Sequence, residues 1–322
     1  MKTFLLRRLL LLPVILLGIS VISFTLLQLA PGDYLDSLKL RPDVSPELIE
    51  EQRRKLGLDR HPVEQYLRWL WSALRLDFGY SFSYKIPVAE LLAQRLPATF
   101  LLAFCATAFA WLIAIPLGVL AALWQGSVFD RLSSALAFFA LAVPEFFLAL
   151  LAVFFAAQTG WFPLTGLTSV DHEFLPPWQK FLDIAHHLFL PTVVLGIGSV
   201  ASLMRIMRAN FLDTMRAEFV MAARAKGVPE LRVLFIHTLR NAINPLVTIF
   251  GYSIAGLLSG SLIVEIVMGY PGIGLLVYEA FFQKDIYVVM ASILMASLML
   301  VLGNLIGDIS LALVDPRIRL EK

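Results

Sequence analysis

Few places along this chain gather side chains that carry chemistry. The segment 159–187 holds three histidines and three acidic residues, and imidazole and carboxylate groups are common ligands of metal ions. Their spacing matches no closed metal site, so we expect solvated loop residues there. Gly251-Tyr252-Ser253-Ile254-Ala255 resembles the turn that presents a nucleophilic serine, but it lies in an apolar run with no candidate base nearby, so we expect no catalysis. Gly256-Leu-Leu-Ser-Gly260 has the GxxxG spacing that lets helices approach closely.

Glu145 is a different kind of candidate, because it is a single carboxyl group inside a long apolar stretch. A charge within a bilayer is costly and usually faces a cavity or another helix. The preceding residue, Pro144, is expected to kink the helix that carries it. We therefore predict that Glu145 lines a passage. Glu265 and Asp308 lie nearer the ends of their apolar runs, where solvation or a structural ion pair is expected.

Composition defines the elements that must hold these residues. Of the 322 residues, 59% are hydrophobic and 16% are charged, and the mean hydropathy is +0.79. A soluble domain has about 25% charged residues, so this composition indicates an integral membrane protein. The 26 Lys and Arg against 24 Asp and Glu give a net charge of +2 without a long basic run, and we expect no nucleic-acid partner. Cys105 is the only cysteine, which excludes a disulfide framework.

Six long runs with few or no charges predict transmembrane helices, because about 20 apolar residues cross the hydrocarbon core. The first run is too long for the core of a signal peptide, so we expect it to be retained. The predicted fold class is all-α, a polytopic membrane protein with six transmembrane helices. The predicted spans are Leu9–Ala30, Thr99–Leu123, Leu132–Gln158, Leu188–Met204, Ala242–Val264 and Ile286–Gly307.

The distribution of Lys and Arg predicts the orientation. The loop 205–245 carries seven of them, whereas the short loops on the opposite side carry only Lys180 and Lys284. Because positive loops stay inside, we expect the loop 205–245 and both termini to be cytoplasmic. The predicted divisions are an N-terminal transmembrane helix at 1–30, an external insert at 31–98, a core of five helices at 99–314 and a cytoplasmic tail at 315–322.

Two amphipathic helices are predicted in the external insert. The first covers residues 45–56 and is followed by Gly57, a residue typical of helix ends. The second covers residues 63–76, and its Trp69 and Trp71 suit a membrane interface. Its predicted apolar face consists of Tyr66, Leu70 and Leu74.

The cytoplasmic loop 205–245 is predicted to form two helices joined by a glycine turn. Gly227 is placed to end the first helix in a left-handed conformation, and Pro229 begins the second. Apolar side chains on such a loop either pack on its own bundle or are covered by a soluble partner. The predicted stripe of the first helix is Phe211, Met215, Phe219, Ala222 and Ala223, and that of the second is Leu231, Leu234, Phe235 and Thr238.

This loop resembles the signature of ABC-importer permeases, which reads EAA, three residues and Gly. Here it is Met221-Ala222-Ala223 followed by Gly227, so Met221 stands where the family has Glu. Nearly the whole chain is similar to the dipeptide, oligopeptide and nickel branch of these permeases. The further matching motifs are Leu29-Ala-Pro-Gly-Asp33, Leu56-Gly-Leu-Asp59, Asp77-Phe-Gly-Tyr-Ser81, Arg95-Leu-Pro-Ala-Thr99, Arg240-Asn-Ala, Tyr270-Pro-Gly-Ile-Gly274 and Asp315-Pro-Arg317.

The resemblance implies a type I ABC importer permease in the bacterial inner membrane, a transport subunit and not an enzyme. Its implied partners are a second homologous permease, two cytosolic ATPase subunits, an external solute-binding protein and the lipid bilayer. ATP and Mg would be held by the ATPases, and no cofactor by this chain, which lacks the G-x-x-x-x-G-K-[ST] motif. The implied ATPase-coupling residues are Phe219, Met221, Ala222, Ala223, Arg224, Lys226 and Gly227.

The resemblance favours short peptides as the cargo. Similar permeases carry nickel chelates, glutathione-like compounds or oligosaccharides, and these stay open as alternatives. A secondary transporter is a more remote alternative, because such proteins often show internal repeats and the two halves of this chain do not match.

Overall fold

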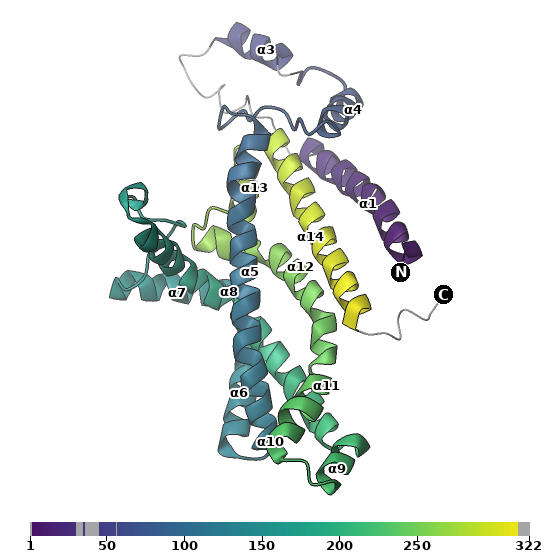
Figure 1. Cartoon of the computed structure of the whole chain (residues 1–322). Helices are drawn as coiled ribbons and strands as arrows, with labels where there is room; N and C mark the ends of the chain where they lie inside the picture. Colours follow the sequence, from purple (N-terminus) through teal and green to yellow (C-terminus); the bar gives the residue numbers. More distant parts are fainter. Residues whose placement is uncertain (1, 30–34, 36–44, 56, 315–322) are drawn as a thin grey trace. The chain divides into compact units, whose positions relative to one another are not determined.

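The computed structural model describes residues 2–29, 35, 45–55 and 57–314, and the regular elements among them are helices (Figure 1). They form two compact units. The first unit combines Lys2–Ala98 with Pro271–Leu298, and the second combines Thr99–Tyr270 with the residues from Met299 onward. The predicted tail 315–322 lies outside the described residues, as do residues 31–34 and 36–44 of the predicted insert 31–98.

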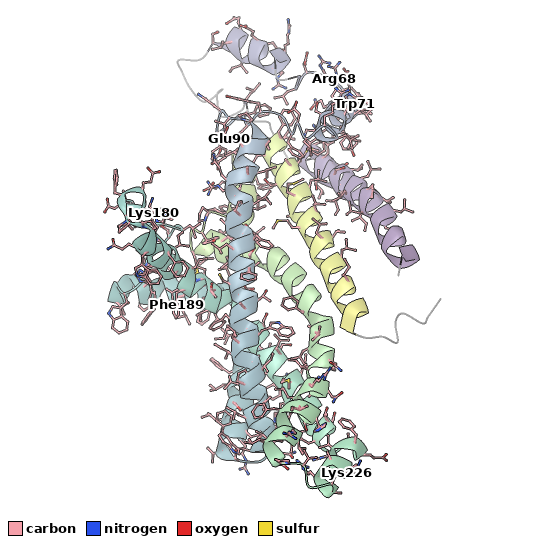
Figure 2. All side chains as sticks on the ribbon, viewed as in Figure 1. Arg68, Trp71, Glu90, Lys180, Phe189 and Lys226 are labelled. Atoms are coloured by element: carbon pink, nitrogen blue, oxygen red, sulfur yellow. The ribbon has the colours of Figure 1, made fainter. Side chains whose placement is uncertain are left out.

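The first unit has its core where α1, α4 and α13 meet the start of α14. Trp69 of α4 is buried in this core, so its predicted place at a membrane interface is wrong. Trp71 on the same helix is exposed, with the Arg75 guanidinium 4.6 Å from its ring centre (Figure 2). Its helices are α1 (Lys2–Leu29), α3 (Pro46–Lys55), α4 (Pro62–Ala73), α13 (Ile273–Phe282) and the first parts of α5 (Val88–Leu123) and α14 (Ile286–Val314).

The two amphipathic helices of the insert are confirmed as α3 and α4. The Leu48 amide donates to Ser45 Oγ (3.3 Å) at the start of α3, and Gly57 after its end has φ +68°. Along α4, Tyr66 and Leu70 pack against the core as predicted. Leu74, the C-cap residue of α4, is exposed instead.

A buried carboxylate, Asp285, fixes the segment before α5 to the start of α14. It accepts hydrogen bonds from Ser81 Oγ (2.7 Å), the Ser83 amide (3.0 Å) and the Val288 amide (3.4 Å). The last of these bonds satisfies one of the free amides at a helix N-terminus. Asp285 is therefore both a helix cap and a link between distant segments.

The second unit is a set of helices packed around α8. Glycines bring α5 and α8 together, because a Cβ at Gly118 would lie 2.7 Å from Cβ of Met207. Small α5 side chains, Ala110 and Ala114 among them, are buried along the same helix. Its further helices are α6 (Val128–Ala142), α7 (Glu145–Thr159), α8 (Pro177–Met215), α9 (Glu218–Ala225), α10 (Glu230–Arg232), a π-helical segment (Val233–Leu239), α11 (Arg240–Ala242) and α12 (Asn244–Val267).

A helix is present at each predicted span. Among the described residues, α1, α5, α8 and α14 are long and apolar enough to cross a membrane, and α6 with α7 makes a fifth if the bent pair is one span. The fifth predicted span, Ala242–Val264, corresponds largely to the 24 residues of α12. Several helices are longer than the apolar runs: α5 begins at Val88 and α8 continues to Met215.

The predicted third span is not one kinked helix. It is broken at Val143 and Pro144 into α6 and α7, which are bent by 100°. Both residues have extended backbone angles, with ψ 124° and 139°. Proline has no amide hydrogen for the helix and disfavours a helical conformation in the residue before it, which explains why the helix ends here.

Candidate functional site

The break between α6 and α7 opens onto a cavity of about 330 Å³ in the second unit. Glu145 is the first residue of α7 and the single charged residue among those that line the cavity. Its Oε1 atom is buried and has no hydrogen-bond partner in the described part of the chain. The lining residues are Ala140, Val143, Glu145, Leu148, Val194, Leu195, Ile197, Gly198, Ser199 and Gly256.

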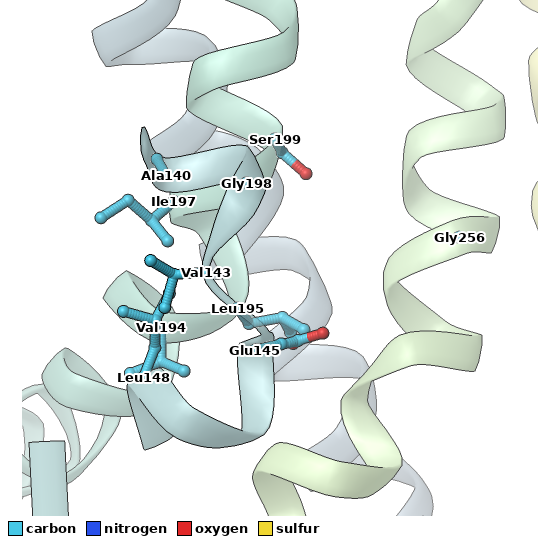
Figure 3. A pocket seen from close by; sticks show the side chains of 10 residues that line it. All are labelled: Ala140, Val143, Glu145, Leu148, Val194, Leu195, Ile197, Gly198, Ser199 and Gly256. Carbon is cyan, nitrogen blue, oxygen red and sulfur yellow. The ribbon is translucent and has the colours of Figure 1, made fainter. Parts of the chain in front are cut away.

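Polar groups and glycines share one side of this cavity. Figure 3 shows the Glu145 carboxylate and the Ser199 hydroxyl both pointing toward the side where Gly256 lies. A Cβ added at Gly198 or Gly256 would meet no atom within 4 Å. Within this chain Gly256 therefore does not mediate the close helix approach that its GxxxG motif predicted; it faces open space.

A second cavity, of about 530 Å³, contains two arginines of α8. Arg208 forms a two-pronged ion pair with Asp130 at the start of α6 (Nε–Oδ1 2.6 Å, Nη2–Oδ2 2.8 Å). Asp130 is only 4% exposed and also accepts from the Gly126 amide (2.9 Å). The Arg205 guanidinium lies 4.3 Å from the centre of the Phe138 ring. This pair is not predictable from the sequence, because 78 residues separate its members and Asp130 stands in no motif.

The helix, glycine turn and helix predicted for the loop 205–245 are present in the order expected. α9 ends before Gly227, which has φ +76°, a left-handed conformation that favours glycine. The Arg224 guanidinium then binds the Glu230 carboxylate across the turn, with Nη2–Oε1 at 2.6 Å and Nε–Oε2 at 3.2 Å. These hydrogen bonds hold the pKa of Glu230 below its usual range. We call residues 218–242 the hairpin.

The predicted stripe on the first helix is wrong, because α8 ends at Met215 and α9 starts anew at Glu218. Phe211 is buried in the core of the second unit. On α9, Ala223 packs against Val220 and Val233 inside the hairpin. Among the residues predicted to couple to an ATPase, the exposed ones are Phe219 (48%), Met221 (53%), Ala222, Arg224, Lys226 and Gly227; Lys226 is labelled in Figure 2.

The second limb of the hairpin also presents a different face from the one predicted. Residues 233–239 form a π-helix, in which side chains five positions apart line up. Val233 and Thr238 are therefore buried together, and Thr238 Oγ1 donates to the Val233 carbonyl (3.1 Å). Leu231 and Phe235, which were predicted on one stripe with Thr238, are exposed instead. An α-helical period cannot reveal this extra residue.

The polar segment 159–187 is more ordered than a solvated loop. Asp183 accepts from the Ser169 amide (3.0 Å) and lies beside the ring nitrogens Nδ1 of His172 (2.6 Å) and His187 (3.3 Å). Within the described residues, no group of three or more His, Cys, Asp and Glu is arranged to hold a metal ion. The contacts of these side chains hold the segment 159–187 in an ordered conformation.

Of the remaining candidate residues, the structure describes the side chain of Glu265 but not those of Ser253 and Asp308. Glu265 is buried and accepts from Thr99 Oγ1 (2.8 Å), so the expected solvation is wrong and a structural role fits.

Comparisons with known proteins agree with this architecture. Residues 114–320 match the family model of the binding-protein-dependent transport system inner membrane component, and residues 1–103 match its N-terminal counterpart. The oligopeptide transport system permease protein AppB of Bacillus subtilis (strain 168) is 40% identical, covering 99% of this chain and of the relative. The dipeptide transport system permease protein DppB of Escherichia coli (strain K12) is 33% identical over 100% of both. An inward-facing structure of the MetNI methionine ABC transporter gives a TM-score of 0.56 at 19% identity, covering 70% of this chain and 96% of that one.

Proposed function

Because this chain belongs to the family of binding-protein-dependent transport system inner membrane components, we propose that it forms half of a passage for short peptides, paired with a second permease and driven by two cytosolic ATPases. As a multi-pass inner membrane component it works with ATPase and binding-protein partners and is a transport subunit, not an enzyme. The resemblance and the all-helical permease fold inferred from the sequence are confirmed.

The broken helix beside a lone carboxylate carries the proposal that this chain lines a passage. Inside a bilayer, irregular backbone is tolerated only where protein buries it or where it lines a water-filled cavity. A charged side chain in the bilayer is subject to the same condition. Val143, which has extended backbone angles, and the carboxylate of Glu145 both line one cavity. Water in this cavity would satisfy the conditions for both the irregular backbone and the charged side chain.

The hairpin is the proposed docking element for an ATPase. Its inner side chains hold its own two limbs together, whereas Phe219, Met221, Leu231 and Phe235 remain exposed. A partner surface that covers them removes apolar area from water, which favours association. With Met221 in place of an acidic residue, this docking contact is mainly apolar. The loop then transmits closure of the ATPases to α8 and α12, with which the hairpin is continuous.

Short peptides are the proposed cargo because the relatives named for oligopeptide and dipeptide transport match along the full chain. Nickel chelates, glutathione-like compounds and oligosaccharides are the outcomes that would replace this cargo. Uptake of each class into vesicles that contain the complete importer and its binding protein distinguishes them.

The proposed orientation places both termini and the hairpin in the cytoplasm and α3 outside. In a variant with Cys105 replaced by Ser, a membrane-impermeant thiol reagent added outside should label Ser45→Cys and not Arg216→Cys. Both positions are exposed, so failure to label reflects the side of the membrane. Labelling of Arg216→Cys from outside would overturn the orientation.

Filling the cavity tests the passage itself. Gly198→Leu puts a large side chain where a Cβ meets no neighbour, and Gly18→Leu in α1 is a matched control with equally open space. We expect Gly198→Leu to lower ATP-driven uptake of a tripeptide by reconstituted importer at least about tenfold and to leave assembly with the ATPase intact. The control variant should transport normally. Normal uptake by Gly198→Leu would remove this cavity from the passage.

A further inference from the structure

Resting on the proposed function above, we propose that Glu145 is the cargo-recognising group of this passage and that it receives a primary ammonium group of the peptide. The Glu145 carboxylate has unused hydrogen-bonding capacity. Glu145 Oε1 is buried in the cavity wall and has no partner among the described residues, and no cation lines the same cavity.

The other acids enclosed in the described part of the chain behave differently. Asp130 is matched by Arg208, Asp183 by the Ser169 amide and His172, Glu265 by the Thr99 hydroxyl, and Asp285 by two serines and a helix amide. Such pairing is the rule, because a buried charge without partners is costly. Glu145 is the exception, and an acid kept without an internal partner suits a partner that arrives from outside.

The position of Glu145 at the start of its helix leaves its carboxylate free to accept further hydrogen bonds. As the first residue of α7 it benefits from the positive end of the helix dipole. The N-cap residue is Pro144, whose side chain makes no capping hydrogen bond, and Oε1 of Glu145 makes none to the described residues either. Oε1 therefore stays available to a donor in the cavity.

The surroundings define the ligand class. A carboxylate accepts charge-assisted hydrogen bonds most strongly from a cation that carries N–H groups. Ser199 adds a hydroxyl on the same side of the cavity (Figure 3), while Val143, Leu148 and Leu195 supply an apolar wall. About 330 Å³ lies within the range of small-ligand pockets. An ammonium group attached to a small apolar body, such as the amino end of a short peptide, matches these features.

One carboxylate in an open cavity also suits transient binding of the cargo. A transport site must bind well enough for cargo to enter and weakly enough for it to leave. A single ionic contact with water nearby meets this condition better than a closed site with several paired charges. Glu145 would therefore select cargo during passage without trapping it.

The test measures uptake by the complete importer with its binding protein in proteoliposomes, comparing wild type with Glu145→Gln. The probes are trialanine, N-acetyl-trialanine and an N-acetylated tripeptide that contains lysine. Each result is the ratio of variant to wild-type rate for the same probe, so selection by the binding protein cancels. Glu173→Gln, which changes an exposed carboxylate in the loop 159–187, is the matched control.

We expect Glu145→Gln to lower the rate for trialanine about tenfold, as loss of one charge-assisted hydrogen bond would, and to leave the rate for N-acetyl-trialanine unchanged. If the N-acetylated lysine peptide is also slowed, the side-chain ammonium serves as well; if not, the α-ammonium alone is recognised. Glu145→Asp should keep most of the preference for the free amine, and the control variant all of it.

Two results would overturn the inference while the passage stands: an unchanged trialanine rate in Glu145→Gln, or an equal loss for free and acetylated probes, which would indicate a structural role. Failure of wild type to carry trialanine at all would instead refute the peptide cargo, and with it the ammonium ligand. A block of sugar or chelate uptake by Gly198→Leu would then still support the passage.

Discussion

Replacing Gly227 tests whether the hairpin turn couples this subunit to an ATPase. Its φ of +76° lies in the left-handed region, and an added Cβ would meet nothing within 4 Å. A substitution there is therefore penalised through the backbone alone and not through a clash. For Val, a β-branched residue, the penalty is about 2 kcal/mol, which corresponds to a roughly 30-fold shift away from the native turn.

Asn is the matched comparison, because its side chain tolerates the left-handed region better than other non-glycine residues do. Gly227→Val should open the turn, separate Arg224 from Glu230 and expose the small core around Ala223. We expect the ATPase to co-purify poorly with this variant and ATP-driven uptake to fall by about the same factor, while Gly227→Asn retains most of both.

Detergent-solubilised complexes provide the co-purification assay, and proteoliposomes provide the uptake assay. The spans are untouched, so the amount of membrane-inserted permease should equal that of wild type in all variants. Normal co-purification and uptake for Gly227→Val would refute the assignment of the hairpin as the coupling element. It would leave the hairpin as a packing element of this chain alone.

Asp130→Ala should destabilise the second unit by about 3 kcal/mol, which is the low end for a broken buried pair, because Arg208 is partly exposed. Thermal unfolding in detergent measures this loss of stability. The double variant with Arg208→Ala should lose less stability than the sum of both single changes. Asp285→Ala leaves buried donors unpaired and removes a helix cap, so it should cost about 1–3 kcal/mol and speed proteolysis of residues 77–87. Because the folded pKa of Glu230 is lowered, its pair with Arg224 should contribute fully above about pH 4.3 and be lost as pH falls below that value. Hydrogen exchange of the hairpin should show this acid-induced loosening in wild type and not in Glu230→Gln.

Hydropathy and local backbone rules predicted much of this fold, because spans, caps and turns depend on neighbouring residues. The turn at Gly227 and the cap at Ser45 are examples. The bend at Pro144 shows the limit of such rules. A proline predicts that the helix is disturbed, but the 100° angle depends on the contacts that α7 makes with α8 and α12.

The candidate site was predictable only in part for a similar reason. Glu145 stands out in the sequence because it interrupts an apolar run, whereas the cavity beside it is built from α6, α7, α8 and α12. Packing also divides neighbours that look equivalent: Ala222 is exposed and Ala223 is buried. Enlarging Ala222 would therefore block docking, whereas enlarging Ala223 would disrupt the hairpin itself.

The π-helical segment Val233–Leu239 has a consequence for how chain length can vary in this family. A π turn accommodates one residue more than an α turn, and the widened backbone absorbs it locally. Deleting one residue there should let the limb continue as an ordinary α-helix, with α10 and α12 keeping their phase relative to each other. α9 has no extra residue of this kind. A deletion within α9 would therefore rotate Ala223 away from Val233, against which Ala223 and Val220 pack. We therefore expect the second limb of the hairpin to tolerate loss of a single residue better than α9 does.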